Sequence, residues 1–187
     1  MIPQSFIEKS AIMNSTIERI AILGSAFNPP SLGHKSVIDE LTHFDRIFLV
    51  PSIAHAWGKQ MLDYDARCQL LEAFTQDLNN PKVSCVYIEQ ELWKPNHKVT
   101  TYQVLTGLQQ AYPQAKLTFV IGPDNLMRFS EFAQAEQITR AWSILACPET
   151  VPIRSSLIRE RLEHQQSITD LTTPTVAQLL AQHRYYV

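Results

Sequence analysis

The segment at residues 24–34, with the sequence GSAFNPPSLGH, constrains the fold and function of this chain more than any other segment. It follows an apolar run at residues 20–23 and precedes residues 34–42, which we interpret as a helix. A strand, a glycine-bounded loop and a helix start suit phosphate binding, because the first N–H groups of a helix lack partners and carry partial positive charge. His34 at this place can donate to phosphate oxygens as charge develops on them. The alternative is a ligand-free turn rich in Pro and Gly, and the chain contains neither G-x-G-x-x-G nor G-x-x-x-x-G-K-[ST].

Length and composition predict one folded domain. The chain has 187 residues, 45% of them hydrophobic and 18% charged, which is ordinary for a globular domain. The net charge of −2 argues against a nucleic-acid partner, since binding to phosphate backbones needs a basic surface. No apolar run approaches the ~18 residues of a membrane span, and residues 1–19 do not resemble a signal peptide. Cys68, Cys85 and Cys147 have neither metal-site nor disulfide spacing. We therefore expect a cytoplasmic protein without membrane or nucleic-acid partners, and homo-oligomerisation stays open.

Strand and helix patterns alternate along the chain. Apolar and β-branched runs predict strands at residues 19–23, 46–50, 82–88, 117–121 and 143–146. Helical periodicity predicts helices at residues 34–42, 63–78, 100–112, 155–164 and 175–183. This alternation predicts a single α/β domain over residues 19–187, with a mostly parallel sheet of five or more strands and helices on both faces. Residues 1–18 form an N-terminal extension, of which the first ~16 residues lie outside the fold or pack as a further helix.

Four of the five glycines follow predicted strands. Gly24, Gly33, Gly58 and Gly122 lie in such loops, whereas Gly107 lies within a helical pattern. Ligands of open parallel sheets bind beyond the carboxyl ends of the strands, near the point where the strand order reverses. These positions therefore predict one ligand crevice, although glycines that merely form turns would give the same pattern.

A second polar segment, IRSSLIR at residues 153–159, lies near the C-terminus. Serines at a helix start cap it and leave N–H donors exposed, and Arg159 can reach along the first turn with a fork of donors. This arrangement suits a polyphosphate tail. The alternative is a serine-capped basic helix without a ligand.

Both segments resemble signatures of the HxGH nucleotidylyltransferase superfamily. Residues 24–34 are similar to its motif G-x-x-F-[DN]-P-x-[HT]-x-G-H, with matches at Gly24, Phe27, Asn28, Pro29, Gly33 and His34. Residues 153–159 are similar to I-S-S-T-x-I-R, with matches at Ile153, Ser155, Ile158 and Arg159. Ser31 departs from the first motif, where His or Thr stands. Arg154 and Ser156 depart from the second, where Ser and Thr stand.

The resemblance within the superfamily is greatest to bacterial nicotinate-mononucleotide adenylyltransferases, and it extends over about residues 20–162. Four intermediate stretches carry it, at residues 50–59, 64–71, 101–105 and 119–126. It implies a Rossmann-like fold and the transfer of AMP from ATP to nicotinate or nicotinamide mononucleotide. The phosphate of the mononucleotide attacks the α-phosphorus of ATP, so catalysis consists of positioning and charge stabilisation.

The resemblance also implies residue roles. We expect His34, Arg159 and Ser31 to be catalytic, with His34 at the α- and β-phosphates and Arg159 at the β- and γ-phosphates. The implied ATP-binding residues are Gly24, Ser25, Phe27, Gly33, His34, Gly122, Asp124, Ile153, Ser155, Ser156 and Arg159. Mg²⁺ bound mainly to ATP oxygens and water is the expected cofactor, and no metal-ligating set is apparent among the side chains.

The expected mononucleotide-binding residues are Trp57, Lys59, Thr101, Tyr102 and Phe132. An aromatic face suits the pyridine ring, and Phe132 stands ten residues after Gly122, where the family has Trp. Phe132 as a core aromatic and Asp124 as a helix cap remain alternatives.

Ser31 and Arg154, together with the short segment 147–152, leave two other hypotheses open. One is a related transferase that acts on phosphopantetheine or on an alcohol or sugar phosphate. The other is a nucleotide-binding protein with weakened catalysis.

Overall fold

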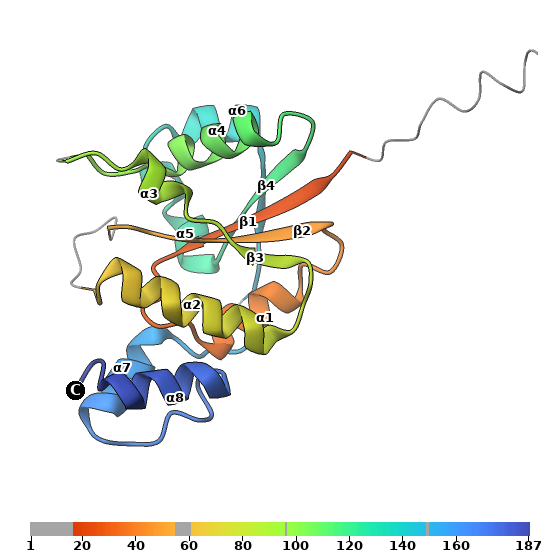
Figure 1. Cartoon of the computed structure of the whole chain (residues 1–187). Coiled ribbons are helices and arrows are strands. Elements are labelled where there is room, and N and C mark those ends of the chain that lie inside the picture. The colour runs from red at the N-terminus through yellow and green to blue at the C-terminus, as the bar shows by residue number, and fades with distance from the viewer. Residues whose placement is uncertain (1–16, 55–60, 96, 149) are drawn as a thin grey trace, which may run out of the picture.

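The computed structural model describes residues 17–54, 61–95, 97–148 and 150–187 (Figure 1). The strands are β1 (Arg19–Ser25), β2 (Arg46–Pro51), β3 (Val83–Cys85), β4 (Lys116–Ile121) and β5 (Ser143–Ala146). The helices are α1 (Leu32–Asp39), α2 (Tyr64–Leu78), α3 (Ile88–Leu92), α4 (Thr101–Ala111), α5 (Pro123–Met127), α6 (Ala135–Ala141), α7 (Ser155–Glu163) and α8 (Pro174–His183), with a 3₁₀ turn, η3, at Phe129–Glu131. The five predicted strands and five predicted helices are all present.

The sheet has the order β3-β2-β1-β4-β5, and every pair is parallel. The predicted Rossmann-like α/β architecture is therefore confirmed. The prediction was wrong at one strand: β3 ends at Cys85, whereas residues up to 88 were expected in it. Ile88 instead begins α3 and packs with α4, so its apolar character reflects burial on a helix.

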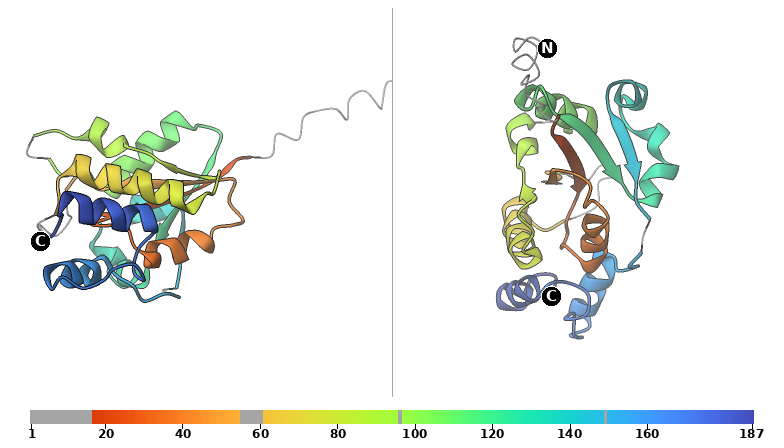
Figure 2. Two further views of the ribbon diagram at one scale, coloured as in Figure 1. Left: turned by 60° about the horizontal axis from the view of Figure 1, so that its bottom comes forward. Right: turned by 90° about the vertical axis from the view of Figure 1, so that its right-hand side faces the viewer.

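Helices cover both faces of the sheet because alternate strand residues point to opposite sides (Figures 1 and 2). On one face Ala21, Leu23, Ile47 and Leu49 pack in a cluster with residues of α1, α2, α7 and α8. On the other face Ile20, Ile22, Phe48 and Val50 pack with residues of α3, α4 and α6. The strands thus read as continuous apolar runs, as expected for a doubly covered sheet.

The sequence patterns missed the short helices α3, α5 and α6, which have 5 to 7 residues each. Helices this short contain too few turns to show a clear helical period in the sequence. No helix in the described parts of the chain is long and apolar enough to cross a membrane. The proposed extension at residues 1–18 lies outside the described residues up to position 16, and β1 begins at Arg19.

Candidate active site

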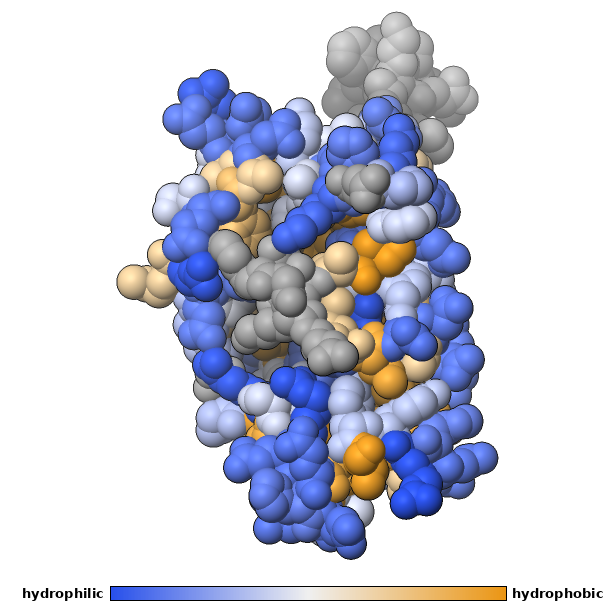
Figure 3. All heavy atoms as spheres, turned by 90° about the vertical axis from the view of Figure 1, so that its left-hand side faces the viewer, coloured by the Kyte–Doolittle hydropathy of each residue, from blue (hydrophilic) through white to orange (hydrophobic). Residues whose placement is uncertain are grey.

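Two adjoining cavities open at the carboxyl ends of the strands. β1 lies between β2 and β4, so the chain leaves β1 toward one side and returns later on the other, which is the reversal point where ligands bind in such sheets. The first cavity has a volume of about 420 Å³ and the second about 450 Å³. Both are lined by Gly24, Ser25, Ala26 and Asn125. Figure 3 views the molecule from this side, where hydrophobic side chains reach the surface among hydrophilic ones.

His34 is held at the first cavity by the start of α1. Ser31 is the N-cap residue, and its backbone N–H donates to His34 Nδ1 over 3.1 Å in a capping box. Because Nδ1 accepts this bond, we assign the ring proton to Nε2. Nε2 then donates to Ser25 Oγ over 3.1 Å. The imidazole therefore presents a donor toward the end of β1.

Burial lowers the pKa of His34 to about 4. The ring of Phe27 lies against it, with 4.8 Å between the ring centroids. Protonation of Nδ1 is also disfavoured because it would direct a second N–H group at the Ser31 N–H. His34 is thus neutral at physiological pH and acts as a fixed N–H donor without a net charge.

The two signature segments meet at Gly33. A Cβ at this glycine would lie 2.2 Å from the carbonyl oxygen of Ile153, so only glycine allows this approach. Ser31 Oγ donates to the same oxygen over 3.0 Å. The segment at residues 153–159 is therefore fastened directly onto the first turn of α1.

Arg159 and Ser155 add two further links between the segments. Arg159 Nη1 donates to the carbonyl oxygen of Asn28 over 2.6 Å, and Ser155 Oγ donates to that of Pro29 over 2.6 Å. The sequence suggested that serines cap α7, but this was wrong: Arg154 is the N-cap residue, and the Ser155 hydroxyl is directed to Pro29 instead. The first N–H groups of α7 consequently remain available beside the cavity.

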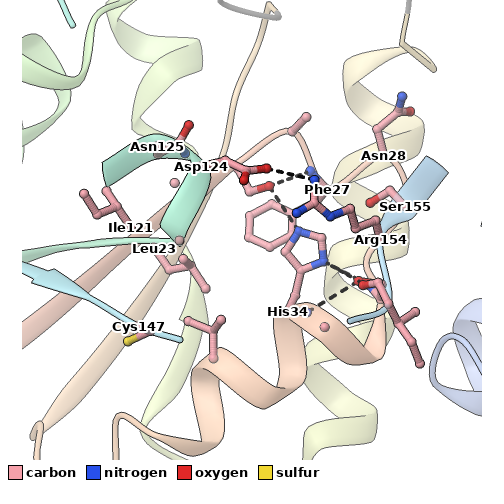
Figure 4. A pocket seen from close by; sticks show the side chains of 18 of the residues that line it. Leu23, Phe27, Asn28, His34, Ile121, Asp124, Asn125, Cys147, Arg154 and Ser155 are labelled. Carbon is pink, nitrogen blue, oxygen red and sulfur yellow. Dashed lines mark hydrogen bonds and ion pairs between the residues drawn. The ribbon is translucent and has the colours of Figure 1, made fainter. Parts of the chain in front are cut away.

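An ion pair spans the first cavity (Figure 4). Arg154 Nη1 lies 2.8 Å from Asp124 Oδ2, which joins the start of α7 to α5. Asp124 follows Pro123 in the first turn of α5, and Gly122 is the N-cap residue, so Asp124 does not cap that helix. The sequence departure at Arg154 thus places a cation at the cavity.

The structure brings together every residue expected at ATP and every residue expected to be catalytic. All of them line the first cavity: Gly24, Ser25, Phe27, Ser31, Gly33, His34, Gly122, Asp124, Ile153, Ser155, Ser156 and Arg159. Their roles in binding and catalysis remain predictions.

The residues expected at the mononucleotide are less closely grouped. Thr101 and Phe132 line the second cavity. The ring of Phe132 also packs against Phe119 and Phe129, so it serves the core and the cavity wall together. Tyr102 lines neither cavity and packs edge-on against Trp142, with 5.7 Å between their ring centroids. Trp57 and Lys59 lie outside the described residues.

Arg67 fixes the loops around both cavities and was not singled out as a site residue. Its side chain is only 1% exposed and donates to the carbonyl oxygens of Ala26, Leu62 and Ile53. The sequence signal for this structural role was a charged residue on the apolar side of a predicted helix.

Glu89 was also missed, although it lines the second cavity. It is 9% exposed, and its Oε2 accepts from the Ile53 N–H over 2.8 Å. Burial raises the pKa of Glu89 to about 7, against the opposing influence of the Ile53 hydrogen bond and of the charge on Arg67.

The fold and the first cavity together define a Rossmann-like domain with a crevice at its switch point. The chain matches the cytidylyltransferase-like family over residues 22–161, about three quarters of its length, and belongs to that family. The expected membership of the nucleotidylyltransferase superfamily is therefore confirmed.

Similar proteins point to one branch. A solved structure of an inferred nicotinate-nucleotide adenylyltransferase from Vibrio parahaemolyticus is 48% identical, with a TM-score of 0.82 over 91% of this chain and 96% of that one. An inferred nicotinate-nucleotide adenylyltransferase of Chlorobium phaeobacteroides is 30% identical over 83% of this chain and 82% of its own length. The Plasmodium falciparum nicotinic acid mononucleotide adenylyltransferase, solved in complex with NaAD, shares the fold at 17% identity, with a TM-score of 0.70 over 90% of this chain and 97% of that one. The resemblance to bacterial nicotinate-mononucleotide adenylyltransferases is thus confirmed.

Proposed function

We propose that this chain transfers AMP from ATP to a pyridine mononucleotide, nicotinate or nicotinamide mononucleotide, and so forms the dinucleotide and pyrophosphate in NAD biosynthesis. The main support is the first cavity, where both signature segments meet around a neutral His34 that has its donor on Nε2. The adjoining second cavity has apolar walls suited to a pyridine ring. The names of the similar proteins support the same reaction.

The reaction needs no nucleophile from the protein. A phosphate oxygen of the mononucleotide attacks the α-phosphorus of ATP, and the bond from that phosphorus to the bridging oxygen of the β-phosphate breaks. His34 would donate its Nε2 proton in a hydrogen bond to the phosphate oxygens, where negative charge increases in the transition state. Arg159 and the first N–H groups of α7 would hold the β- and γ-phosphates as pyrophosphate departs.

Mg²⁺ is the cofactor that we propose to accompany ATP, where it would neutralise phosphate charge. Asp124 is the carboxylate that lines the first cavity among the described residues, and it pairs with Arg154. No cluster of three or more His, Cys, Asp or Glu side chains that could hold a metal occurs within the described ranges. This donor set fits an ion that is coordinated mainly by ATP and water.

The proposal is tested by pyrophosphate release from ATP and Mg²⁺ with nicotinate or nicotinamide mononucleotide. We expect turnover with at least one of them, and His34→Ala should lower kcat by about 10²-fold or more through loss of the donor. His164→Ala, which removes an exposed histidine on the far end of α7, is the matched control and should leave kcat unchanged. ATP binding without turnover would instead favour another phosphate acceptor or a binding protein.

A cytoplasmic location is proposed too, supported by the free thiols of Cys68, Cys85 and Cys147.

A further inference from the structure

The loop at residues 26–31, which carries most of the first signature segment, is held through its carbonyl groups. Residues 27–31 are all buried, and a buried loop needs partners for its backbone polar groups. Side chains from outside the loop supply them: the carbonyl groups of Ala26, Asn28, Pro29 and Pro30 accept from Arg67, Arg159, Ser155 and Thr172, respectively. The position of this loop thus depends on α2, on α7 and on the segment between α7 and α8.

The side chain of Asn28 links the loop to a further part of the chain. Asn28 is 6% exposed, and in Figure 4 its amide points away from His34. Its Oδ1 accepts from the Leu62 N–H over 3.1 Å and lies within hydrogen-bond distance of the Tyr186 hydroxyl. A backbone N–H can only donate, so the atom that faces Leu62 is the amide oxygen, and the Tyr186 hydroxyl must donate to it as well. Asn28 therefore presents its carbonyl to Arg159 and its amide oxygen to Tyr186.

Tyr186 reaches Asn28 because the chain turns back after α8, toward the start of α2 (Figure 1). Its backbone is left-handed, with φ of 63°, and a bulky residue keeps this conformation only where its contacts hold it. Burial raises the pKa of Tyr186 against the opposing charges of Arg159 and Arg67. The hydroxyl group consequently keeps its proton at neutral and mildly alkaline pH and remains a hydrogen-bond donor.

Arg159 depends on Asn28 for its direction. Within the described parts of the chain, its guanidinium makes one hydrogen bond, which Nη1 donates to the Asn28 carbonyl. The remaining N–H groups of the planar fork stay available at the first cavity, which Arg159 lines and Tyr186 does not. A shift of Asn28 would therefore turn these donors relative to a bound phosphate.

We infer that Tyr186 is a positioning residue for the triphosphate of ATP, which acts through Asn28 and Arg159. The inference rests on the proposed function, in which Arg159 holds the β- and γ-phosphates. The Tyr186 hydroxyl fixes the amide of Asn28, and the carbonyl of the same residue fixes the Arg159 guanidinium.

Tyr186→Phe tests the inference because it removes the hydroxyl and keeps the ring. The loss of one hydrogen bond changes an equilibrium by about fivefold. We expect kcat/KM for ATP to fall by about fivefold or more in pyrophosphate release, while the KM for the mononucleotide changes less than about twofold. Tyr185→Phe is the matched control and should change neither value. The Tyr185 ring stacks on His183, and its hydroxyl makes no hydrogen bond among the described residues.

Thr175→Val measures the effect of lost stability alone. The Thr175 hydroxyl of α8 donates to Asp77 Oδ1 of α2 over 2.6 Å, so this variant also loses one hydroxyl bond but leaves residues 26–31 untouched. Both Thr175→Val and Tyr186→Phe should lower Tm by about 2–4 °C, and only Tyr186→Phe should lower kcat/KM for ATP. Equal losses of kcat/KM in the two variants would show that Tyr186 only stabilises the fold and would overturn the inference, as would an unchanged kcat/KM in Tyr186→Phe.

A double-mutant cycle identifies the route through Arg159. In the Arg159→Lys background, Tyr186→Phe should lower kcat/KM for ATP by less than about twofold, because the guanidinium that Tyr186 positions is already absent. A loss as large as in the wild-type background would mean that Tyr186 acts independently of Arg159, which contradicts the inference.

Calorimetric binding of ATP separates this inference from the proposed function. If the wild type binds ATP but releases no pyrophosphate with either mononucleotide, the proposed function fails. The inference still holds in that case if Tyr186→Phe weakens ATP binding by about fivefold only when Arg159 is present. Normal turnover with a wild-type kcat/KM in Tyr186→Phe contradicts the inference alone, and absence of ATP binding by the wild type contradicts both.

Discussion

Replacing Gly33 with Ala would test how closely the two signature segments must approach. The new Cβ would lie 2.2 Å from the carbonyl oxygen of Ile153, whereas real Cβ contacts essentially never fall below 3.0 Å. The first turn of α1 and residue 153 would therefore have to separate by about 0.8 Å or more. Neither atom belongs to a flexible side chain, so the backbone itself must move.

This movement has two consequences of different size. Overpacking of this kind costs about 1–3 kcal/mol, and a domain of this length loses roughly 2–4 °C of Tm for each kcal/mol. His34 follows Gly33 directly, and Ser31 Oγ bonds to the displaced carbonyl, so the imidazole shifts as well. A displacement of about 1 Å in a catalytic group can cost about 10²-fold in rate.

Thermal unfolding and pyrophosphate release measure the two effects on the same sample. Gly122→Ala is the matched control, because a Cβ there meets no atom within 4 Å, and its Tm should stay within about 2 °C of the wild type. If Gly33→Ala retained both the wild-type Tm and the wild-type kcat/KM, the two segments could not be joined as described.

Three further substitutions have definite expected results. Arg159→Lys should raise the KM for ATP by about tenfold, because Lys cannot bind the Asn28 carbonyl and a phosphate at once as the planar guanidinium can. The control is Arg161→Lys on the same helix, which should leave the KM unchanged because Arg161 pairs with Asp170. Arg67→Met should lower the free energy of unfolding by about 3 kcal/mol or more, because three backbone carbonyl groups lose their hydrogen-bond donor. Urea denaturation measures this loss, and a loss below about 1 kcal/mol would contradict the role given to Arg67. The pKa of His34 is about 4 in the folded protein and 6.5 in the unfolded chain, so the unfolded chain is protonated first as the pH falls. The buried neutral imidazole therefore contributes stability above pH 6.5 that is lost as the pH falls toward 4. Relative to His34→Asn, the wild type should therefore lose about 2–3 kcal/mol between pH 7 and 4.5, and parallel pH curves for the two proteins would refute this assignment.

The sequence predicted most of the sheet because its inner strands, β2, β1 and β4, are buried on both faces and appear as short apolar runs. Local pattern alone could not show that Gly33 touches Ile153, since the two residues are 120 positions apart. The resemblance of both segments to one superfamily supplied this long-range information. The residues expected at ATP therefore all line the first cavity, although the contacts among them were not anticipated and their roles remain predictions.

The second cavity was predicted less well for reasons of helical phase and burial. Tyr102 is one position beyond Thr101, and this turns its side chain by about 100° around α4, away from the cavity and onto Trp142. Glu89 follows a segment that was interpreted as a strand, so its inward direction on α3 could not be inferred. Arg67 lies in the family-like stretch at residues 64–71, but its three backbone partners come from loops that have no sequence pattern of their own.

The structure also accounts for Ser31, the departure that most favoured a weakened catalyst. The hydrogen bond that fixes the His34 tautomer comes from the Ser31 backbone N–H, which every residue except proline supplies. The Ser31 hydroxyl donates to the Ile153 carbonyl over 3.0 Å, accepts from the His34 backbone N–H over 3.4 Å and lies 2.9 Å from His34 Nδ1. A serine hydroxyl suffices for these contacts. A histidine or threonine is therefore not needed at this position to hold His34 as a neutral donor. Ser31 therefore supplies the backbone donor that holds the neutral tautomer of His34, and by itself it gives no reason to expect an inactive site.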